Sequence, residues 1–221
     1  MPGLSELTDL DIEPSALYRT FGEEKHAADF VAGRIWISTL AYCRSIEDAI
    51  RRDPDEGRMR YVTEGPLRGD SDDPIFAEIA RRSGVRFTNS KNILLINCQT
   101  RQTVPDGLVI CMSKKRLDKF GRYCVRIDSP LKMFKVISDA LQAAGYIKAN
   151  PGHMKGLITG VDYRSRELKY PDPEPVHPGA VKPKIFEDEY EVRMLWPLLK
   201  LGPAPFMLTC EAAKKYCTPI P

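Results

Sequence analysis

Carboxylates recur at every second position near the end of the chain, in the stretch K184-I-F-E-D-E-Y-E-V-R-M-L-W196. Glu187, Glu189 and Glu191 share one register, and Arg193 follows them in it. Because a strand turns alternate side chains to opposite faces, this spacing predicts a strand with a ladder of carboxylates along one face. Like charges side by side repel one another, so the ladder requires compensating cations or a chemical use. The other register predicts an apolar face made of Phe186, Tyr190, Val192, Met194 and Trp196.

Two further polar features lie on strands predicted earlier in the chain. Arg19 lies on the first of these strands, and Ser38 and Thr39 end the second. Each feature has an ordinary structural interpretation, as a surface arginine or as caps of the following helix. They indicate a shared site only if the fold brings them into one cleft with the late carboxylates.

The elements that must position these residues mix strands and helices without strict alternation. This order favours an α+β fold, with a mixed, largely antiparallel sheet and flanking helices in a single domain over residues 1–221. The prediction places strands at 17–21, 34–39, 93–98, 108–113 and 122–128, a hairpin at 157–170, and helices at 23–32, 46–52, 75–82 and 130–144.

Three segments are predicted to lie outside these elements. Residues 1–16 form an N-terminal extension, whereas 53–73 and 170–184 are loops or flaps, because proline, glycine and charge concentrate in them.

Composition excludes several classes of protein. Lys and Arg outnumber Asp and Glu by 33 to 30, an excess too small to argue for nucleic-acid binding or for an acidic membrane surface. The start of the chain has no apolar signal core, and no apolar run approaches the roughly 20 residues of a membrane span. The six cysteines form no C-x-x-C pair, which favours reduced thiols in the cytoplasm and no metal centre. No glycine-rich nucleotide-binding pattern of the Rossmann or P-loop type occurs.

The polar features together resemble the Arg–Ser–Glu class of mono-ADP-ribosyltransferases. That class has an arginine on an early strand, a Ser-Thr-Ser-like motif on the next and a Glu-x-Glu on a late strand. The matching residues are Arg19, Ser38-Thr39-Leu40 and Glu189-Tyr190-Glu191, with Leu40 replacing the third residue of the Ser-Thr-Ser motif. A largely uncharacterised bacterial family, with some members in phage-defence or abortive-infection settings, is similar at Y18-R-T-F-G, G33-R-I-W-I-S-T-L-A-Y-C-R44, R52-D-P-D-E-G57 and E189-Y-E-V-R193.

The resemblance implies an ADP-ribosyltransferase-like fold and NAD as co-substrate. The implied activity is transfer of ADP-ribose to a macromolecule, nucleic acid or protein, or hydrolysis of NAD, in a defence or toxin role. Glu191 would stabilise the positive charge that develops on the ribose, as in glycoside hydrolysis, and Glu189 would deprotonate the acceptor.

The resemblance also implies a set of residues that hold NAD. Arg19 would bind the pyrophosphate through its planar guanidinium. Ser38 would help to position the nicotinamide or Glu191, Thr39 would belong to the same NAD-binding set, and the ring of Tyr42 would stack on the nicotinamide.

Two other classes of function remain open from the sequence. A metal-dependent nuclease could use Asp53, Asp55 and Glu56 as oxygen ligands, completed by Glu189 or Glu191. Such a site would carry Arg193 where these enzymes usually have a lysine, and arginine is a poor general base. A non-catalytic binding or immunity module is the third class. The oligomeric state and the acceptor are not determined by the sequence.

Overall fold

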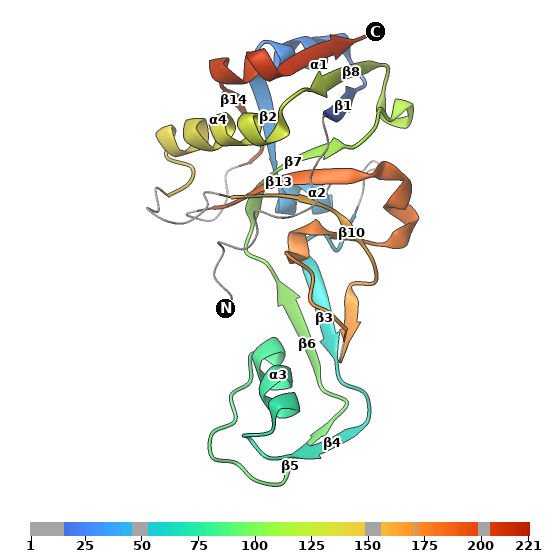
Figure 1. Cartoon of the computed structure of the whole chain (residues 1–221), viewed down its shortest axis with the longest axis vertical. Coiled ribbons are helices and arrows are strands. Elements are labelled where there is room, and N and C mark those ends of the chain that lie inside the picture. The colour runs from blue at the N-terminus through green and yellow to red at the C-terminus, as the bar shows by residue number, and fades with distance from the viewer. Residues whose placement is uncertain (1–15, 46–52, 149–155, 171, 199–203) are drawn as a thin grey trace.

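The computed structural model describes residues 16–45, 53–148, 156–170, 172–198 and 204–221. The helix predicted at 46–52, and the predicted N-terminal extension apart from Ala16, lie outside these ranges. Figure 1 shows a body built around a large sheet, from which an elongated arm projects.

The body confirms the predicted α+β class with a largely antiparallel sheet. Its eight strands follow the order β14-β2-β7-β1-β8-β15, with β13 on β7 and β9 on β13, and all of these pairings are antiparallel. The strands are β1 (Leu17–Phe21), β2 (Arg34–Thr39), β7 (Gly107–Ser113), β8 (Tyr123–Ile127), β9 (Leu157–Gly160), β13 (Glu191–Pro197), β14 (Phe206–Thr209) and β15 (Cys217–Ile220).

A fork opens in the sheet beside β7. One edge of β7 pairs with β13 from Gly107 to Ser113. The other edge pairs with β2 at Leu108 and Val109 and with β1 at Ser113. Since β1 and β2 meet β7 at different points, the two strands diverge and leave a wedge of space between them.

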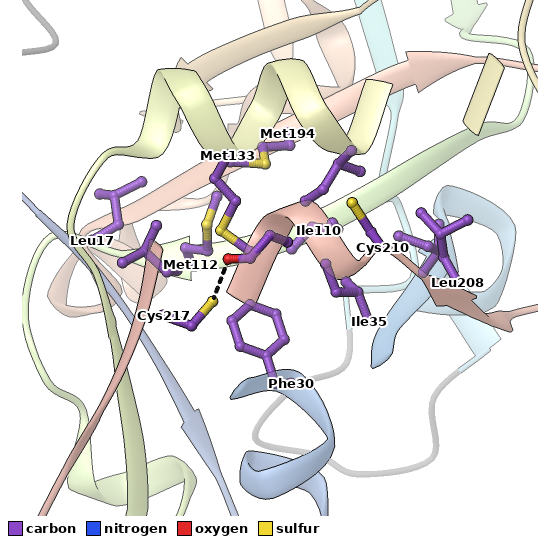
Figure 2. Packing of buried hydrophobic residues seen from close by; sticks show 14 of the residues in the cluster. Leu17, Phe30, Ile35, Ile110, Met112, Met133, Met194, Leu208, Cys210 and Cys217 are labelled. Carbon is purple, nitrogen blue, oxygen red and sulfur yellow. Dashed lines mark hydrogen bonds between the residues drawn. The ribbon is translucent and has the colours of Figure 1, made fainter. Parts of the chain in front are cut away.

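One face of the sheet carries the main hydrophobic core, covered by α1 (Glu24–Val31), α4 (Pro130–Ala143) and the 3-10 helix η5 (Glu211–Tyr216). The helix predicted at 130–144 is confirmed as α4, and Met133, Ile137 and Leu141 on one of its faces are completely buried. Sulfur atoms are frequent in this core, and Figure 2 shows the Cys217 thiol directed at a carbonyl oxygen of η5. All six cysteines are free thiols, as predicted.

The arm corrects the prediction that residues 53–73 form a loop or flap. This segment contains β3 (Arg58–Val62) and β4 (Pro66–Gly69). The sequence does not reveal β3, because Arg58 and Arg60 occupy its outward positions and make the segment look like a polar loop. Met59, Tyr61 and Val62 are its buried residues. The remaining elements of the arm are α3 (Pro74–Ser83), β5 (Ile93–Ile96), β6 (Gln99–Thr103) and β11 (Glu167–Lys169).

The predicted hairpin over 157–170 is wrong, because its strands pair with distant segments instead of with each other. β9 pairs with β13, β10 (Asp162–Tyr163) with β12 (Val181–Lys182), and β11 with β3. The segment predicted as a loop at 170–184 contains β12 and the short 3-10 helix η3 (Pro178–Ala180).

The strand predicted to carry the carboxylate ladder is also corrected. Residues Lys184–Glu189 form the 3-10 helix η4, Tyr190 adopts a left-handed conformation with φ of 46°, and β13 begins only at Glu191. The reversal at Tyr190 leaves its ring 46% exposed instead of buried, and Phe186 lies half-buried on η4. The predicted inward positions on β13 itself are confirmed, since Val192, Met194 and Trp196 are buried.

A hydrogen bond within the core gives a test of this packing. Trp196 donates its indole N–H to the Ser138 hydroxyl at 2.8 Å, and its ring stacks on Phe134 of α4. Ser138→Ala leaves a buried donor without its acceptor, so we expect the free energy of unfolding to fall by about 1–3 kcal/mol in chemical denaturation. Lys135→Ala, at an exposed position on the same helix, is the control, and an equally small loss in both variants would contradict the packing.

Candidate functional site

A cavity of about 750 Å³ occupies the fork between β1 and β2. Its wall is formed by these strands, by β7 and β13, and by α1 and α2 (Leu40–Ser45). It therefore joins segments from both ends of the chain. Five of the residues predicted as site residues line it: Arg19, Ser38, Tyr42, Glu189 and Glu191.

The strand register places Glu191 in the middle of the sheet. Ser113 of β7 lies opposite Tyr18 on one side and Glu191 on the other. Directly opposed residues in antiparallel strands turn their side chains to the same face. Tyr18, Ser113 and Glu191 thus form one row across three strands, on the face opposite the main core, with Cys111 and Arg193 in the next row.

Arg193 holds Glu191 and Glu56 together in the interior. Its guanidinium donates to Glu191 Oε1 at 2.7 Å, and to both carboxylate oxygens of Glu56. It also donates to the carbonyl of Gly179. Because the Arg193 side chain is only 2% exposed, each of these bonds compensates part of its desolvation.

Glu56 reaches Arg193 through a tight turn. Hydrogen bonds from Glu56 N–H to the Asp53 carbonyl and from Arg58 N–H to the Asp55 carbonyl form the turn, and Gly57 follows Glu56 with φ of +70°. A Cβ at Gly57 would lie 2.8 Å from a methyl group of Val104, so a larger residue is excluded there. Within the same turn, the buried carboxylate of Asp53 accepts two bonds from Arg166.

Lys182 connects the two glutamates of the Glu-x-Glu motif. Its ammonium lies 2.7 Å from Glu189 Oε2 and 2.7 Å from Glu191 Oε2. Tyr163 fixes the backbone of the same motif, because its hydroxyl accepts a bond from the N–H of Glu191 at 2.7 Å. Glu189 and Glu191 are 4% and 6% exposed, so neither is a solvated surface carboxylate.

The buried cluster contains four carboxylates, Asp53, Glu56, Glu189 and Glu191, and three cations, Arg166, Lys182 and Arg193. It therefore carries one carboxylate more than it has cations, apart from Lys119, which lies 3.8 Å from Glu189 at the partly exposed edge. A proton on one carboxylate would balance the charge.

The pKa values of the two motif glutamates move in opposite directions. Burial alone would raise the pKa of Glu191, but Arg193 and Lys182 overcome this effect and hold it well below its usual value. For Glu189, burial outweighs the attraction of Lys182 and raises the pKa. Glu191 is therefore the carboxylate that is ionised at neutral pH, and Glu189 is the one that takes up a proton more readily.

The groups around this pair keep their ordinary protonation states at neutral pH. Burial opposes the charge of Lys182, yet Glu191 and Glu189 hold its pKa above the usual value. Lys182 lowers the pKa of Glu189, but the burial of Glu189 has the larger effect and raises it. Burial raises the pKa of Tyr163 to about 12, so its hydroxyl remains neutral.

Ser38 and Thr39 are divided between two structural roles. Thr39 is buried and does not line the cavity; its hydroxyl accepts a bond from the N–H of Tyr42 and caps α2. Ser38 faces the cavity, with its hydroxyl 3.6 Å from the Cys43 sulfur. The ring of Tyr42, on the first turns of α2, lines the cavity and is 43% exposed.

Arg19 and Tyr18 both line the cavity, but their side chains lie on opposite faces of β1. It shares a face with Leu17, which belongs to the main core. Its guanidinium carbon lies 5.1 Å from the centre of the Phe30 ring and 5.5 Å from that of Phe21. The aromatic contacts hold the guanidinium in the part of the fork next to α1.

A second group of cations surrounds this part of the cavity. Lys25 on α1 and Arg34 at the start of β2 line the wall, together with Asp29, whose carboxylate accepts hydrogen bonds from Arg34. Arg34, Trp36 and Ser38 alternate along the same face of β2, so they span roughly 13 Å of it. The cavity thus runs from a basic and aromatic region to the buried carboxylates.

Of the carboxylates that the nuclease hypothesis requires, Asp53 and Glu56 lie in the same cluster as Glu189 and Glu191, but each of these two is bound by an arginine. Asp53 is bound by Arg166, and Glu56 by Arg193. Asp55 lies apart from them on the surface, 65% exposed. Among the described residues there is no group of three or more side chains that could hold a metal ion.

Sequence reasoning missed Lys182 and Arg166 as members of the site. Lys182 lies in the proline-rich segment predicted as a flap, and its only signal is a single charge after the short apolar run Gly179–Val181. No pattern distinguishes Arg166 from the other arginines in its neighbourhood. Both pair with residues far away in the chain, which only the fold brings close.

Comparisons of the chain with protein-family models, with curated proteins and with solved structures find no match. Within the described ranges, no helix combines the length and the apolar character needed to cross a membrane.

The charge cluster predicts how stability depends on pH. A carboxylate with a lowered folded pKa stabilises the fold above its unfolded pKa, and this contribution disappears as the pH falls through the folded value. We therefore expect Glu191→Gln to cost about 3 kcal/mol of unfolding free energy near pH 7, because Arg193 and Lys182 lose a buried partner. The deficit should shrink as the pH falls below about 4, in the window given by the lowered pKa of Glu191.

The control for this experiment is the exposed pair of Glu64 and Lys169 on the arm. Glu64→Gln should change stability by less than about 0.5 kcal/mol at every pH, since Glu64 is largely solvated. Urea denaturation at a series of pH values measures both variants. A deficit of Glu191→Gln that stays constant down to low pH would contradict the assignment of an ionised, ion-paired Glu191.

Proposed function

We propose that the fork cavity binds NAD, and that the protein cleaves the nicotinamide–ribose bond and transfers ADP-ribose to a macromolecular acceptor or to water. One observation carries the proposal: a single cavity joins a buried carboxylate held by two cations to guanidinium and ammonium groups and to exposed aromatic rings. The fork between the Arg19 and Ser38 strands supports an ADP-ribosyltransferase-like fold. A role in bacterial defence or as a toxin rests on the sequence resemblance.

The cavity fits the charges of NAD. The dinucleotide has an anionic pyrophosphate and a cationic nicotinamide ring, so its site needs cations in one region and carboxylates in another. Arg19, Lys25 and Arg34 supply the first, and Glu189 and Glu191 the second. The volume of about 750 Å³ lies within the range of small-molecule sites.

Glu191 supplies the electrostatic stabilisation. Loss of nicotinamide takes the bonding electron pair onto the ring nitrogen and leaves positive charge on the ribose. A carboxylate fixed in place before the reaction stabilises such a charge without reorganisation. Arg193, Lys182 and the Tyr163 hydroxyl hold Glu191 in one ionised arrangement. The net negative charge of the cluster favours a cation nearby.

Glu189 acts as the general base. A hydroxyl or amine of the acceptor forms the new bond to the ribose carbon, and its proton passes to the Glu189 carboxylate. The raised pKa of Glu189 makes it the better proton acceptor of the pair. Lys182 bridges both carboxylates, and therefore positions the base relative to Glu191.

The remaining predicted residues hold the substrate. Arg19 binds the pyrophosphate in the basic region of the cavity, where Trp36 offers a ring that is 43% exposed. Ser38 and the ring of Tyr42 contact the nicotinamide end. Thr39 acts indirectly, since it caps the helix that carries Tyr42.

The nuclease hypothesis is less well supported, because the carboxylates it requires have other partners. Arg166 and Arg193 occupy oxygens of Asp53 and Glu56 that a magnesium ion would need. A non-catalytic binding module would share the cavity and differ only in the absence of turnover.

Replacement of the ionised carboxylate tests the proposal directly. In Glu191→Gln we expect nicotinamide release from NAD to fall at least about 100-fold, the scale for loss of one preorganised electrostatic group. Release is measured by chromatography at a temperature where circular dichroism shows the variant to be folded. Glu64→Gln on the arm should retain full release, and a folded Glu191→Gln protein with undiminished release would refute the assignment.

The role of Glu189 predicts a pH dependence. A general base works when deprotonated, so transfer should increase with pH through a pKa above the ordinary carboxyl value of about 4.3, in line with the raised pKa of Glu189. Glu189→Gln should remove this acidic limb and reduce transfer about 10²–10⁴-fold. If transfer by Glu189→Gln rises with pH through the same pKa as transfer by the wild type, the general base is another group.

A further inference from the structure

The segment between β7 and β8 concentrates positive charge at the mouth of the cavity. Residues 114–122, here called the basic loop, contain five cationic side chains and one carboxylate, all exposed. The whole chain has a net charge of only +3, so this loop is a local feature that the overall composition hides. The cations are Lys114, Lys115, Arg116, Lys119 and Arg122. Arg116 pairs with Asp118, the one carboxylate of the loop, and Lys119 pairs with Asp188 of η4, so Lys114, Lys115 and Arg122 carry the excess charge.

The body of the protein holds the basic loop in a fixed position. Leu117 and Phe120 turn inward and line the cavity. Gly121 has φ of +149°, and a Cβ there would lie 2.0 Å from the carbonyl oxygen of Phe21, so the loop packs backbone to backbone against β1. Its cations therefore have a defined place next to the proposed active site.

Tyr190 presents an aromatic ring beside this loop. The residue has φ of 46°, a conformation that bulky side chains rarely adopt and that costs of order 1–3 kcal/mol. Lys114 donates its N–H to the Tyr190 carbonyl at 2.9 Å, and the Lys115 ammonium lies 3.7 Å from the centre of the Tyr190 ring. The loop and η4 are the light green and dark orange segments at one end of β13 in Figure 1.

The chain position of Tyr190 connects this surface to the chemistry. Tyr190 lies between Glu189 and Glu191, whose carboxylates line the cavity, whereas its own ring is 46% exposed. Ser113, directly before the loop, donates its hydroxyl to the Glu189 carbonyl at 2.7 Å. The left-handed backbone thus turns one ring outward between two carboxylates that point inward.

We propose that the basic loop and Tyr190 bind single-stranded nucleic acid as the acceptor. The loop cations contact the phosphates, and an unpaired base stacks on Tyr190. Cations alone would suit any polyanion, including an acidic peptide. The exposed ring favours nucleic acid, because every base has a face that stacks on an aromatic side chain and a carboxylate side chain has none.

The catalytic consequence rests on the proposed function. A nucleotide held on Tyr190 brings its hydroxyl or exocyclic amine next to Glu189. That group gives its proton to Glu189 and forms a bond to the ribose carbon, while nicotinamide leaves with the bonding electron pair.

Binding is tested without NAD, so that its outcome is independent of turnover. Fluorescently labelled oligo(dT) and oligo(U) of about 12 nucleotides, within the usual site size for single strands, are titrated at several salt concentrations. The slope of log affinity against log salt should decrease by about 0.7 for each phosphate contact removed, hence by about 1.4 in Lys114→Ala/Arg122→Ala. Lys132→Ala/Lys135→Ala, exposed on α4, is the matched control and should bind like the wild type.

The aromatic contribution is tested separately. Tyr190→Ala should weaken binding roughly 5- to 150-fold at an unchanged salt slope, whereas Tyr190→Phe, which keeps the ring, should bind like the wild type. A preference between the two oligonucleotides identifies DNA or RNA as the acceptor. Equal affinity for a poly-glutamate peptide, or loss of affinity in the control double variant alone, would overturn the proposal.

Nicotinamide release from NAD, measured both with and without oligonucleotide, separates the two proposals. Oligonucleotide binding with no nicotinamide release in either condition supports the surface and refutes the NAD-dependent activity. Release without oligonucleotide binding supports the activity and refutes the surface.

Discussion

The buried guanidinium of Arg193 is the interaction on which the site depends. It is bound by Glu191, Glu56 and the carbonyl of Gly179, and Glu56 lies more than 100 residues before the other two in the chain. An unpaired charge at this depth would be strongly destabilising, so the fold must deliver all of these partners together. Breaking one contact therefore disturbs the position of the turn, the proline-rich segment and the start of β13 at once.

This constraint also makes the arm part of the site. The turn that carries Asp53 and Glu56 leads directly into β3 of the arm, and Arg166 precedes β11. The segments that lead into two strands of the arm thus supply two carboxylates and one cation to the interior of the body. The packing of the arm fixes the orientation of Glu191 through Arg193, although the arm lies away from the fork.

Charge balance explains why two neighbouring glutamates differ. The cluster has one carboxylate in excess, and for Glu189 the effect of burial exceeds that of Lys182, so its pKa is raised. Glu191, held by both Arg193 and Lys182, stays ionised. Two residues of the same type, two positions apart, thereby acquire different chemistry from their surroundings alone.

The sequence determined the elements whose hydrophobic period is strong, because burial of an apolar face is encoded locally. It predicted β1, β2, α1 and α4. It also predicted Glu189 and Glu191 as a pair of candidate catalytic carboxylates. It could not show that β13 begins after a left-handed Tyr190, that residues near 60 form a strand, or that Lys182 joins the two glutamates. Those features depend on partners distant in sequence, and the energy of a buried charge is decided by which groups the tertiary structure places around it.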